Sequence, residues 1–598
     1  MKKVFAMLLA AVMVLSLAAC GQQAAAPAAT EAAPAAPAAT EAAAPAATEA
    51  APAATEAAPA ATEAAAPAED PSETSHLTIL WHQAGGTNGA FEPMWYDYQS
   101  SVPDLMYDTL VKLDMEDTAK VVYRIADKMD VSDDGLSYTF HIRDDAKWQD
   151  GEPVKASDVY WTWKAKCGGK YALSDDTTNA TYVEGAQDYY DGKATEISGI
   201  TVDEAANTVT FKLNALYGGF LRMMAVTGIF PEHCFTTTDM MNIADDPYWQ
   251  FPITCGPYKL VEVNFPDYCV LERNDDWYGP KPGIKTVYGR SFDATGEEAA
   301  INAMVAGELD WAHSNGFNDI SVASNIASQN PDYNYAAFAA SYFRYFSINQ
   351  GEAQDGKLNP WMKEPKFRQA INKAIDKNAF ASYFPGQAVA LSTCINPGDP
   401  LYNKDIPLFE RDVEGAKALL AEIGYDGTPV RIQYYYSDQT TMDLMDLAAQ
   451  NLSEVGIPAE ATLMTGDLTA AISDIKNYDL LYGGLNSPSN ADNYDGSSWT
   501  TGKATDARYC DTEYRASFYD PRQAIVNTSS DPAVIAQPLN EMQLQGLEDC
   551  YVMPCISMNK MFIYNDAKWD FDETWLKCNQ LALYKCCDLR LETWKLNY

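Results

Sequence analysis

The chain has 598 residues and a formal net charge of −41, which argues against nucleic-acid binding because phosphates demand basic surfaces. The same acidity opposes docking on anionic lipid. The part that is rich enough in apolar residues to fold runs from about residue 76 to residue 598, a length that predicts two or three domains.

The N-terminus carries an export signal. Lys2 and Lys3 precede an apolar run over residues 4–19, which ends in small residues before Cys20. This layout is typical of a signal peptide, and neither this run nor any later stretch reaches the roughly 20 apolar residues that a membrane-crossing helix needs. The stretch "LAAC" (residues 17–20) resembles the lipobox of bacterial lipoproteins, in which the cysteine is acylated. The resemblance implies that Cys20 is a lipid anchor; an ordinary secreted protein with a chance cysteine is the alternative.

Residues 21–75 have a composition that disfavours a packed core. Variants of "APAATEA" recur there, with no aromatic residue and almost no branched apolar residue. Such a segment buries too little surface to offset the entropy of ordering it, and its prolines disfavour helix. We expect a disordered linker that reaches at most on the order of 150 Å, either a spacer of tuned length or one without a length requirement.

Cysteine and histidine give no recognisable site. Assigning Cys20 to lipid leaves 11 of the 12 cysteines, an odd number that leaves at least one thiol free or paired with another molecule. No CxxC pair occurs and the five histidines are scattered, so no zinc signature is present. Cys550 and Cys555 either close a short loop or are buried as small apolar side chains. We expect no cofactor, and no catalytic or metal role for any cysteine.

Local motifs of exported enzymes do not occur. The sequence has no GxSxG, HExxH or GxxxxGK[ST], which removes the simplest assignments as esterase, zinc peptidase or nucleotidase. A carboxylate-based glycosidase leaves weaker traces and stays open. "NADNYDGSSW" (490–499) approaches a calcium loop, but Tyr494 falls where an oxygen ligand belongs, so a polar turn is favoured.

The predicted elements alternate along the chain and indicate a mixed α/β fold. "HLTILWH" (76–82) is a short β-rich run, and the alternation in "GLSYTFHI" (135–142) and "ANTVTFKL" (206–213) is typical of half-buried strands. Apolar residues recur at helical spacing in "KFRQAINKAID" (366–376) and "DVEGAKALLAEIG" (412–424). In the second helix Asp412 can form the N-cap and Gly424 can end it.

Several further motifs follow one another in a fixed order: "ADKMDVSDDGLSYTFHIRDDAKWQDGEPVKASDVYWTW" (126–163), "TCGPYKLVEV" (254–263), "VLERNDDWYG" (270–279), "AMVAGELDWA" (303–312), "PKFRQAINKAIDKNAF" (365–380) and "AKALLAEIGY" (416–425). Together they resemble the extracellular solute-binding proteins of family 5, the oligopeptide, dipeptide and nickel receptors of ABC importers. Most of these residues are architectural. Gly135 and Gly151 suit turns with a positive φ, and Asp158 can cap the helix of "DVYWTW".

The resemblance implies a fold and a division into domains. The fold is α/β and periplasmic-binding-protein-like, of class II, with two lobes that are joined by a hinge and close over a ligand. A small domain is inserted into the first lobe. The implied boundaries are a signal peptide at 1–20, the linker at 21–75, lobe I at 76–110, 216–345 and 561–598, the inserted domain at 111–215, and lobe II at 346–560.

The family's mode of binding implies ligand contacts just after particular strands. "LWHQAGG" (80–86) follows the first strand and supplies three candidates, with packing as the alternative for the tryptophan. A second group follows "VRIQYYY" (430–436). The candidates are Trp81, His82 and Gln83 in the first lobe, and Tyr436, Ser437 and Thr440 in the second.

"YDLLYGGLNSPSNADNY" (478–494) corresponds to a segment in which peptide-binding members carry Gly-Trp and then an Asp that pairs with the ligand's α-amino group. Here Gly484 replaces the Trp, and Asn486 or Ser487 replaces the Asp. Because a buried ammonium without a carboxylate partner is costly, free peptide N-termini are disfavoured unless Asp492 or Asp495 compensates. Neutral groups suit an oligosaccharide or a peptide held by its backbone; the candidate contacts are Asn486, Ser487 and Asn490.

The sequence therefore predicts a monomeric, lipid-anchored capture protein on the extracytoplasmic face of a bacterial cell membrane. Its expected partners are ABC permease subunits with cytoplasmic ATPases, and it is expected to be no enzyme. Peptides are the favoured ligand, and an oligosaccharide or another small solute is the alternative; a nickel complex is the least favoured. An exported carboxylate hydrolase and an adhesive or sensory lipoprotein are the alternatives from other classes.

Overall fold

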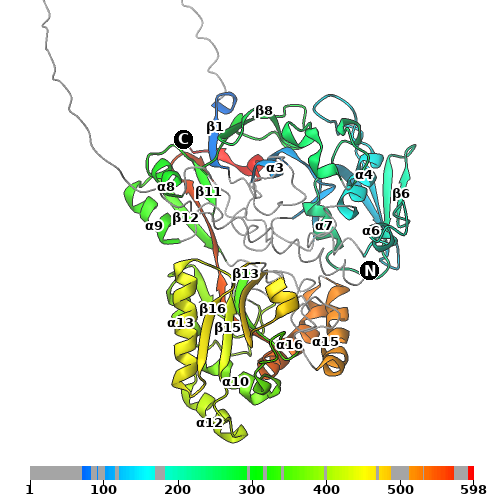
Figure 1. The fold of residues 1–598 in the computed structure, drawn as a ribbon. Helices are drawn as coiled ribbons and strands as arrows, with labels where there is room; N and C mark the ends of the chain where they lie inside the picture. Colours follow the sequence, from blue (N-terminus) through cyan, green and yellow to red (C-terminus); the bar gives the residue numbers. More distant parts are fainter. Residues whose placement is uncertain are drawn as a thin grey trace, which may run out of the picture.

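The computed structural model describes residues 71–81, 91, 101–114, 120–168, 182–240, 242–292, 297–313, 320–338, 342–395, 397, 401–466, 470–486, 511–529, 531–570 and 590–597. These residues form two bodies, which Figure 1 draws one above the other. We call residues up to 338 and from 559 onward the upper body, and residues 342–558 the lower body. Within the described ranges no helix has both the length and the apolarity to cross a membrane.

The upper body contains a seven-stranded mixed sheet of order β12-β19-β11-β1-β10-β9-β8. β1 pairs in parallel with β10 and β11, and the remaining neighbours are antiparallel. Three helices accompany this sheet: α3 (Ser101–Met106), α8 (Glu297–Val305) and α9 (Ile320–Gln329). The strands are β1 (His76–Leu80), β8 (Tyr258–Asn264), β9 (Tyr268–Arg273), β10 (Thr286–Arg290), β11 (Trp311–His313), β12 (Tyr333–Phe338) and β19 (Lys560–Asn565).

A second sheet of the upper body lies at the right of Figure 1, beyond α4. It is antiparallel, in the order β4-β5-β7-β6. Both predicted strands of this region are present, and Phe140 in β5 is fully buried. The elements are β4 (Ala126–Val131), β5 (Ser137–Ile142), β6 (Ile200–Asp203) and β7 (Thr208–Lys212), with α4 (Ala156–Cys167), α6 (Ala186–Tyr190), α7 (Phe220–Val226) and the 3-10 turn η5 (Glu232–Cys234).

The turns and the helix start of this region follow the sequence with one correction. Gly135 and Gly151 have φ of 69° and 94°, as their predicted turns require. Asp158, however, is not the N-cap of α4. The helix begins after Lys155, and the Asp158 carboxylate reaches back from the third helical position to accept the Lys155 N–H over 2.9 Å. It stabilises the helix start from inside the first turn.

Smaller pairs and turns complete the upper body. They are β2 (Val111–Leu113) with β3 (Val121–Tyr123), β20 (Trp569–Asp570) with β21 (Lys595–Leu596), and the 3-10 turns η2 (Pro71–Glu73), η6 (Ile243–Asp245), η7 (Pro247–Gln250) and η12 (Leu591–Thr593).

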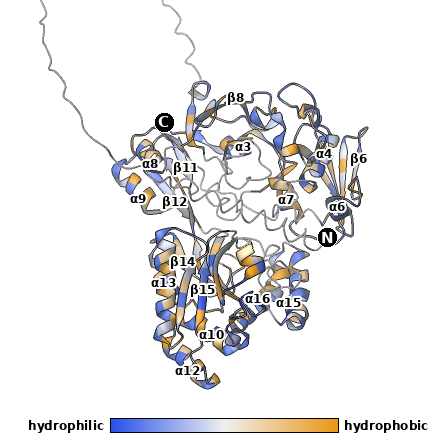
Figure 2. Ribbon diagram, viewed as in Figure 1, coloured by the Kyte–Doolittle hydropathy of each residue, from blue (hydrophilic) through white to orange (hydrophobic). Residues whose placement is uncertain are grey.

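The lower body is a six-stranded sheet of order β14-β18-β13-β17-β15-β16 with helices around it (Figure 1). Figure 2 shows that these helices carry both hydrophilic and hydrophobic residues, as expected when one face packs on a sheet. The strands are β13 (Tyr342–Ile348), β14 (Ala388–Ala390), β15 (Val430–Tyr434), β16 (Ala459–Leu463), β17 (Leu480–Asn486) and β18 (Val552–Met558). The helices are α10 (Pro365–Ala374), α11 (Lys377–Ser382), α12 (Val413–Ile423), α13 (Gln439–Glu454), α15 (Thr512–Asn527) and α16 (Pro532–Asp549), with the short turns η8 (Pro360–Lys363) and η9 (Ala471–Ile475).

Both helices predicted in the lower body are confirmed, but the first ends two residues earlier than the predicted range of 366–376. α10 ends at Ala374, because Asp376 caps a new helix, α11, by accepting the Ala379 N–H over 2.9 Å. α12 begins after Asp412 and ends at Gly424, which has a left-handed φ of 67°. Cys550 and Cys555 are free thiols that are buried in the core of this body, so they do not form a short disulfide loop.

Candidate functional site

The chain passes between the two bodies at two neighbouring places. β12 and β19 pair in the upper sheet up to Phe338 and Lys560. β13 and β18 pair in the lower sheet from Phe343 and Ser557. Asn559 separates β18 from β19, and its N–H donates to Gln387 O over 2.5 Å. The described ends of these two passages are residues 338, 342–343 and 557–560, which we together call the crossover ribbon. Small backbone rotations between the two sheets can move one body relative to the other.

A polar and aromatic cluster lies at the edge of the lower sheet next to the crossover ribbon. β15 and β17 run parallel and end at this edge, where Tyr342 at the start of β13 pairs with Asn486 at the end of β17. The guanidinium carbon of Arg344 lies 3.5 Å from the ring centre of Tyr436. The rings of Tyr435 and Tyr436 lie 4.4 Å apart. We call Arg344, Tyr435, Tyr436, Gly483 and Gly484 the strand-end cluster.

Tyr435 is held over β17 by its hydroxyl. The Gly484 N–H donates to this hydroxyl over 3.1 Å, and the Tyr436 hydroxyl donates to it over 3.3 Å. A methyl group at Gly483 would lie 2.9 Å from the same oxygen, closer than a Cβ normally approaches. The glycine at 483 thus leaves the space that the Tyr435 hydroxyl occupies.

Asp479 fixes the other ends of the two parallel strands. It is fully buried, and its carboxylate accepts the N–H of Asn359 over 2.8 Å and the N–H of Arg431 over 2.7 Å. Because Arg431 belongs to β15 and Asp479 directly precedes β17, this carboxylate ties the strand starts together. The register of β15 against β17, and hence the position of the strand-end cluster, depends on it.

The predicted second-lobe residues of 436–440 lie at or next to this cluster. Tyr436 is half-buried and belongs to it, whereas Ser437 is exposed. Thr440 lies in the first turn of α13, which Asp438 caps by accepting the Thr441 N–H over 2.8 Å. Their contact with a ligand stays a prediction.

Trp81 packs in the upper body. Its side chain is 1% exposed and stacks on Phe91 with 5.4 Å between ring centres. This is the packing alternative that the sequence left open. The remaining predicted residues, or their side chains, lie outside the part that the structure describes: Cys20, His82, Gln83, Ser487, Asn490 and the side chain of Asn486.

The two bodies also touch away from the crossover ribbon. The Gly218 N–H donates to Asn527 O over 2.9 Å, and the Asn527 side-chain amide donates to the Tyr182 hydroxyl over 3.2 Å. Tyr182 stacks on Tyr217, with ring centres 4.2 Å apart. Asn527 ends α15, at the right of the lower body in Figure 1. We call these interactions the Asn527 contact.

Sequence reasoning missed several of these residues. Arg344 was detectable as a charge within the aromatic run "YFRYF", and Tyr435 as the neighbour of a predicted residue. The Asn527 contact joins residues 345 positions apart, and no local pattern could have indicated it. What the strand-end cluster offers chemically is recognition: a guanidinium for an anionic group and tyrosine rings for packing or stacking.

Residues 120–507 match the family model for bacterial extracellular solute-binding proteins, family 5, in its middle part. The chain belongs to this family. The prediction from the sequence motifs is therefore confirmed at the level of the family, whose members are binding proteins rather than enzymes.

Three relatives illustrate the range of family 5. A Brucella ovis protein with the provisional name of an ABC transporter peptide-binding protein is 26% identical over 381 residues, or 62% of this chain and 66% of the relative. The oligopeptide-binding protein AppA of Bacillus subtilis is 26% identical over 56% of each chain. The nickel-binding periplasmic protein of Escherichia coli is 24% identical over 60% of this chain and 66% of its own length. The matched part thus spans 56–66% of the length of these relatives.

Solved structures of family 5 share the fold. The substrate-binding protein CtaP of Listeria monocytogenes superposes with a TM-score of 0.66 at 18% identity, covering 88% of this chain and 99% of its own. AppA of Bacillus subtilis, solved with a nonapeptide, gives a TM-score of 0.60 at 18% identity and the same coverage. The predicted two-lobed α/β fold of class II is confirmed.

Proposed function

We propose that this family 5 protein captures a solute outside the cell membrane and delivers it to the permease of an ABC importer, and that peptides are its ligand class. Family membership supports the receptor role. Among its relatives, AppA is named for oligopeptides and was solved with a nonapeptide. Others are named for nickel and for glutathione, so the ligand must be argued from the chain itself.

The observation that carries the proposal is the position of the strand-end cluster beside the crossover ribbon. In a two-lobed receptor a ligand at such an edge contacts both bodies only when they close, and these added contacts shift the population to the closed form. Arg344 and Tyr436 then supply a cationic and an aromatic surface side by side, because the guanidinium carbon lies 3.5 Å from the centre of the tyrosine ring. A peptide offers both matching groups, a carboxylate for the guanidinium and side chains for the rings.

The missing Asp in 484–487 suggests how a peptide is bound. Without that carboxylate, a free α-amino group of the ligand contributes little binding energy. The guanidinium of Arg344 instead favours the carboxylate at the C-terminal end of the peptide. We therefore expect recognition by the C-terminal carboxylate and by the peptide backbone. An oligosaccharide is the second candidate, because the rings of Tyr435 and Tyr436 can stack on a sugar. Within the described strand-end cluster no residue is a histidine or cysteine, so nickel is disfavoured.

The proposal extends to anchoring and to domain boundaries. Cys20 would carry the lipid, residues 21–75 would form the linker, and the folded part would be a monomer. The strands of the seven-stranded sheet come from the start, middle and end of the folded part, which supports a lobe I of three stretches, proposed at 76–110, 216–345 and 561–598. β13 nevertheless lies in the lower sheet from Tyr342 and β19 begins at Lys560, so the junctions of lobe I fall a few residues before 345 and 561. The boundaries of the inserted domain (111–215) and of lobe II (346–560) remain part of the proposal. Metabolic labelling with fatty acid, lost in Cys20→Ala, checks the anchor.

A thermal-shift screen of di- to hexapeptides against cello- and xylo-oligosaccharides tests the function. A true ligand at 100 times its Kd should stabilise the protein by about 2.7 kcal/mol. Acetylating the peptide N-terminus should leave this stabilisation unchanged. Amidating the peptide C-terminus should remove most of the stabilisation of the wild type. Arg344→Gln should be stabilised less from the start, and amidation should reduce its stabilisation little further.

Tyr436→Ala should also weaken peptide binding. Tyr383→Ala, which removes an exposed tyrosine of the same body, is the matched control.

Three results would overturn parts of this proposal. Release of product from a peptide or glycan would make the protein a hydrolase. Stabilisation by oligosaccharides alone would exclude peptides. Unchanged peptide binding in Asn486→Ala and Ser487→Ala would remove those two residues from the site.

A further inference from the structure

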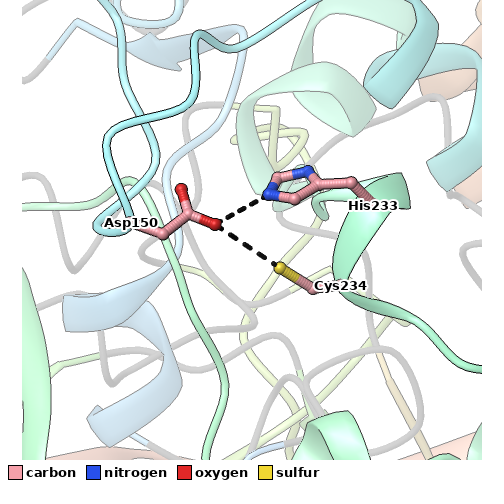
Figure 3. Close-up of side chains that lie close together, drawn as sticks. All are labelled: Asp150, His233 and Cys234. Atoms are coloured by element: carbon pink, nitrogen blue, oxygen red, sulfur yellow. Dashed lines mark hydrogen bonds and ion pairs between the residues drawn. The ribbon is translucent and has the colours of Figure 1, made fainter.

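Three metal-ligating side chains meet in the upper body, outside the strand-end cluster. Asp150 lies in the turn after β5, and His233 and Cys234 lie in η5 (Figure 3). The His233 Nε2 is 2.8 Å from Asp150 Oδ2, and the Cys234 thiol donates to the same oxygen over 3.9 Å. The three ligand atoms all lie within 4.8 Å of one another.

The backbone holds both segments of this trio in place. The Asp150 Oδ1 atom accepts the Glu152 N–H over 3.1 Å, which leaves Oδ2 turned to His233 and Cys234. The buried carboxylate of Asp158 accepts the Glu232 N–H over 3.0 Å and the Trp148 indole N–H over 3.2 Å. Asp158 thus fastens the start of η5 to the turn that carries Asp150, which is the kind of outer support that orients ligands in metal sites.

A second His–Asp pair in the same body differs from the trio in the third group that lies beside the aspartate oxygen. His141 Nε2 lies 2.8 Å from Asp130 Oδ2, the same separation as in the trio. At that oxygen the third group is the Lys128 ammonium, at 2.7 Å, and a fixed positive charge opposes a cation. At Asp150 the third group is a thiol, which is itself a ligand.

We propose that Asp150, His233 and Cys234 bind one divalent metal ion of the zinc class. Nitrogen, oxygen and sulfur ligands together suit zinc. Around a tetrahedral ion with bonds of about 2.0–2.3 Å, ligand atoms lie roughly 3.3–3.7 Å apart. The separation of 2.8 Å between His233 and Asp150 therefore has to widen by about 0.5 Å, and the separation of 3.9 Å between Cys234 and Asp150 has to shorten by about 0.3 Å. The ion takes the place of the hydrogen bond between His233 and Asp150. Because the side chains of His233 and Asp150 are 39% and 28% exposed, the fourth position faces solvent.

Bound metal would join the turn of Asp150 to η5 by coordination bonds, and so would stabilise the upper body independently of any captured solute. No motif in the sequence indicated this site, and we had predicted no metal role for any cysteine. Asp150 and His233 are 83 residues apart, so the ligand spacing matches no linear motif.

Titration of the full chain with Co²⁺ alone, in a non-thiol reductant, tests the proposal. We expect saturable binding of one ion with a thiolate-to-cobalt charge-transfer band, and competition by Zn²⁺. Cys234→Ser should abolish the band and weaken binding at least about tenfold. Asp150→Asn, which keeps an acceptor for the Glu152 N–H, should also weaken it. His141→Gln, the matched control, should bind like the wild type.

Unfolding curves of all variants without metal show whether they are folded. At one fixed Zn²⁺ concentration, the unfolding midpoint of the wild type and of His141→Gln should rise by similar amounts, and those of Cys234→Ser and Asp150→Asn should rise less. The proposal is wrong if the wild type binds no ion saturably, if Cys234→Ser retains the wild-type affinity, or if His141→Gln loses binding as Cys234→Ser does.

Discussion

At the scale of single residues, Lys377 is a lysine whose amine lies inside the lower body. Its side chain is 1% exposed, its amine donates to Leu391 O over 3.1 Å, and it lies 4.5 Å from the Phe409 ring centre. Burial lowers the pKa of Lys377 below its ordinary value of 10.5, although the nearby thiols of Cys555, Cys550 and Cys394 act in the opposite direction. The charged amine therefore costs stability.

We predict that Lys377 makes stability rise with pH. Between the lowered pKa in the folded chain and 10.5 in the unfolded chain, the unfolded chain binds more protons, so the free energy of unfolding increases by up to about 1.4 kcal/mol per pH unit. Lys377→Met should lack this increase and should be more stable than the wild type near neutral pH. Urea unfolding at several pH values measures both effects.

Lys417→Met, which removes an exposed lysine of α12, controls for the loss of one positive charge. Equal pH profiles for the wild type and Lys377→Met would contradict the prediction. The sequence could not have indicated this burial. Lys377 follows an N-cap aspartate, where a lysine ordinarily lies in solvent, and only the packing of β14 and β18 near α11 encloses it.

At the scale of elements, α12 shows which features of a helix can be predicted from residues close in sequence. Asp412 and Gly424 were predicted as its ends, and both are. The structure adds a tertiary partner, because the Asp412 carboxylate accepts the Gly415 N–H over 2.8 Å with one oxygen and the Lys373 amine of α10 over 2.7 Å with the other. A methyl group at Gly415 would overlap this carboxylate. Helix ends, and the glycine that leaves space for the capping carboxylate, follow from sequence because their signals are local, whereas the pairing with Lys373 depends on the neighbouring helix.

We predict that Asp412→Ala lowers the free energy of unfolding by about 1 kcal/mol. Asp412→Asn should cost less, since asparagine also caps but loses the ion pair with Lys373. The hydrogen bond from Lys373, with that from Gly415, lowers the pKa of Asp412 below 3.8, so the ionic contribution is present above that value and is lost as the pH falls through the pKa of the folded chain. The difference between Asp412→Asn and the wild type should therefore vanish in acid, and a difference that persists there would exclude the ion pair as its cause.

At the scale of the whole molecule, the Asn527 contact and the crossover ribbon hold the two bodies at different places. We predict that this contact favours the arrangement of the bodies that binds solute. Tyr182→Phe, which removes the hydroxyl but keeps the ring stacked on Tyr217, should then weaken solute binding about two- to tenfold, the worth of one net hydrogen bond. Calorimetric titration with a ligand from the peptide screen measures this loss. Asn527→Ala should weaken solute binding by a similar factor. The double variant should bind only a little more weakly than either single variant, because both changes remove the same hydrogen bond.

Unchanged affinity in both variants, or fully additive losses, would show that this contact does not favour the binding form. The arrangement of the bodies was predictable only through the resemblance to family 5. Strand and helix patterns gave the α/β class, but which strands share a sheet depends on pairs such as β12 with β19, more than 200 residues apart in the chain. Likewise the motifs of 126–163 marked the family without marking the strand-end cluster, because Gly135, Gly151 and Asp158 shape turns and a helix start.

The place of β19 in the upper sheet has a consequence for biosynthesis. β19 lies between β12 and β11, yet it follows the entire lower body in the chain. A polypeptide that emerges N-terminus first therefore presents β11 and β12 with open edges while more than 200 further residues are still being made, and such edges invite wrong pairing. The lower body can fold from one continuous stretch during this time. β19 emerges directly after it, so the seven-stranded sheet can close only once the lower body has been synthesised.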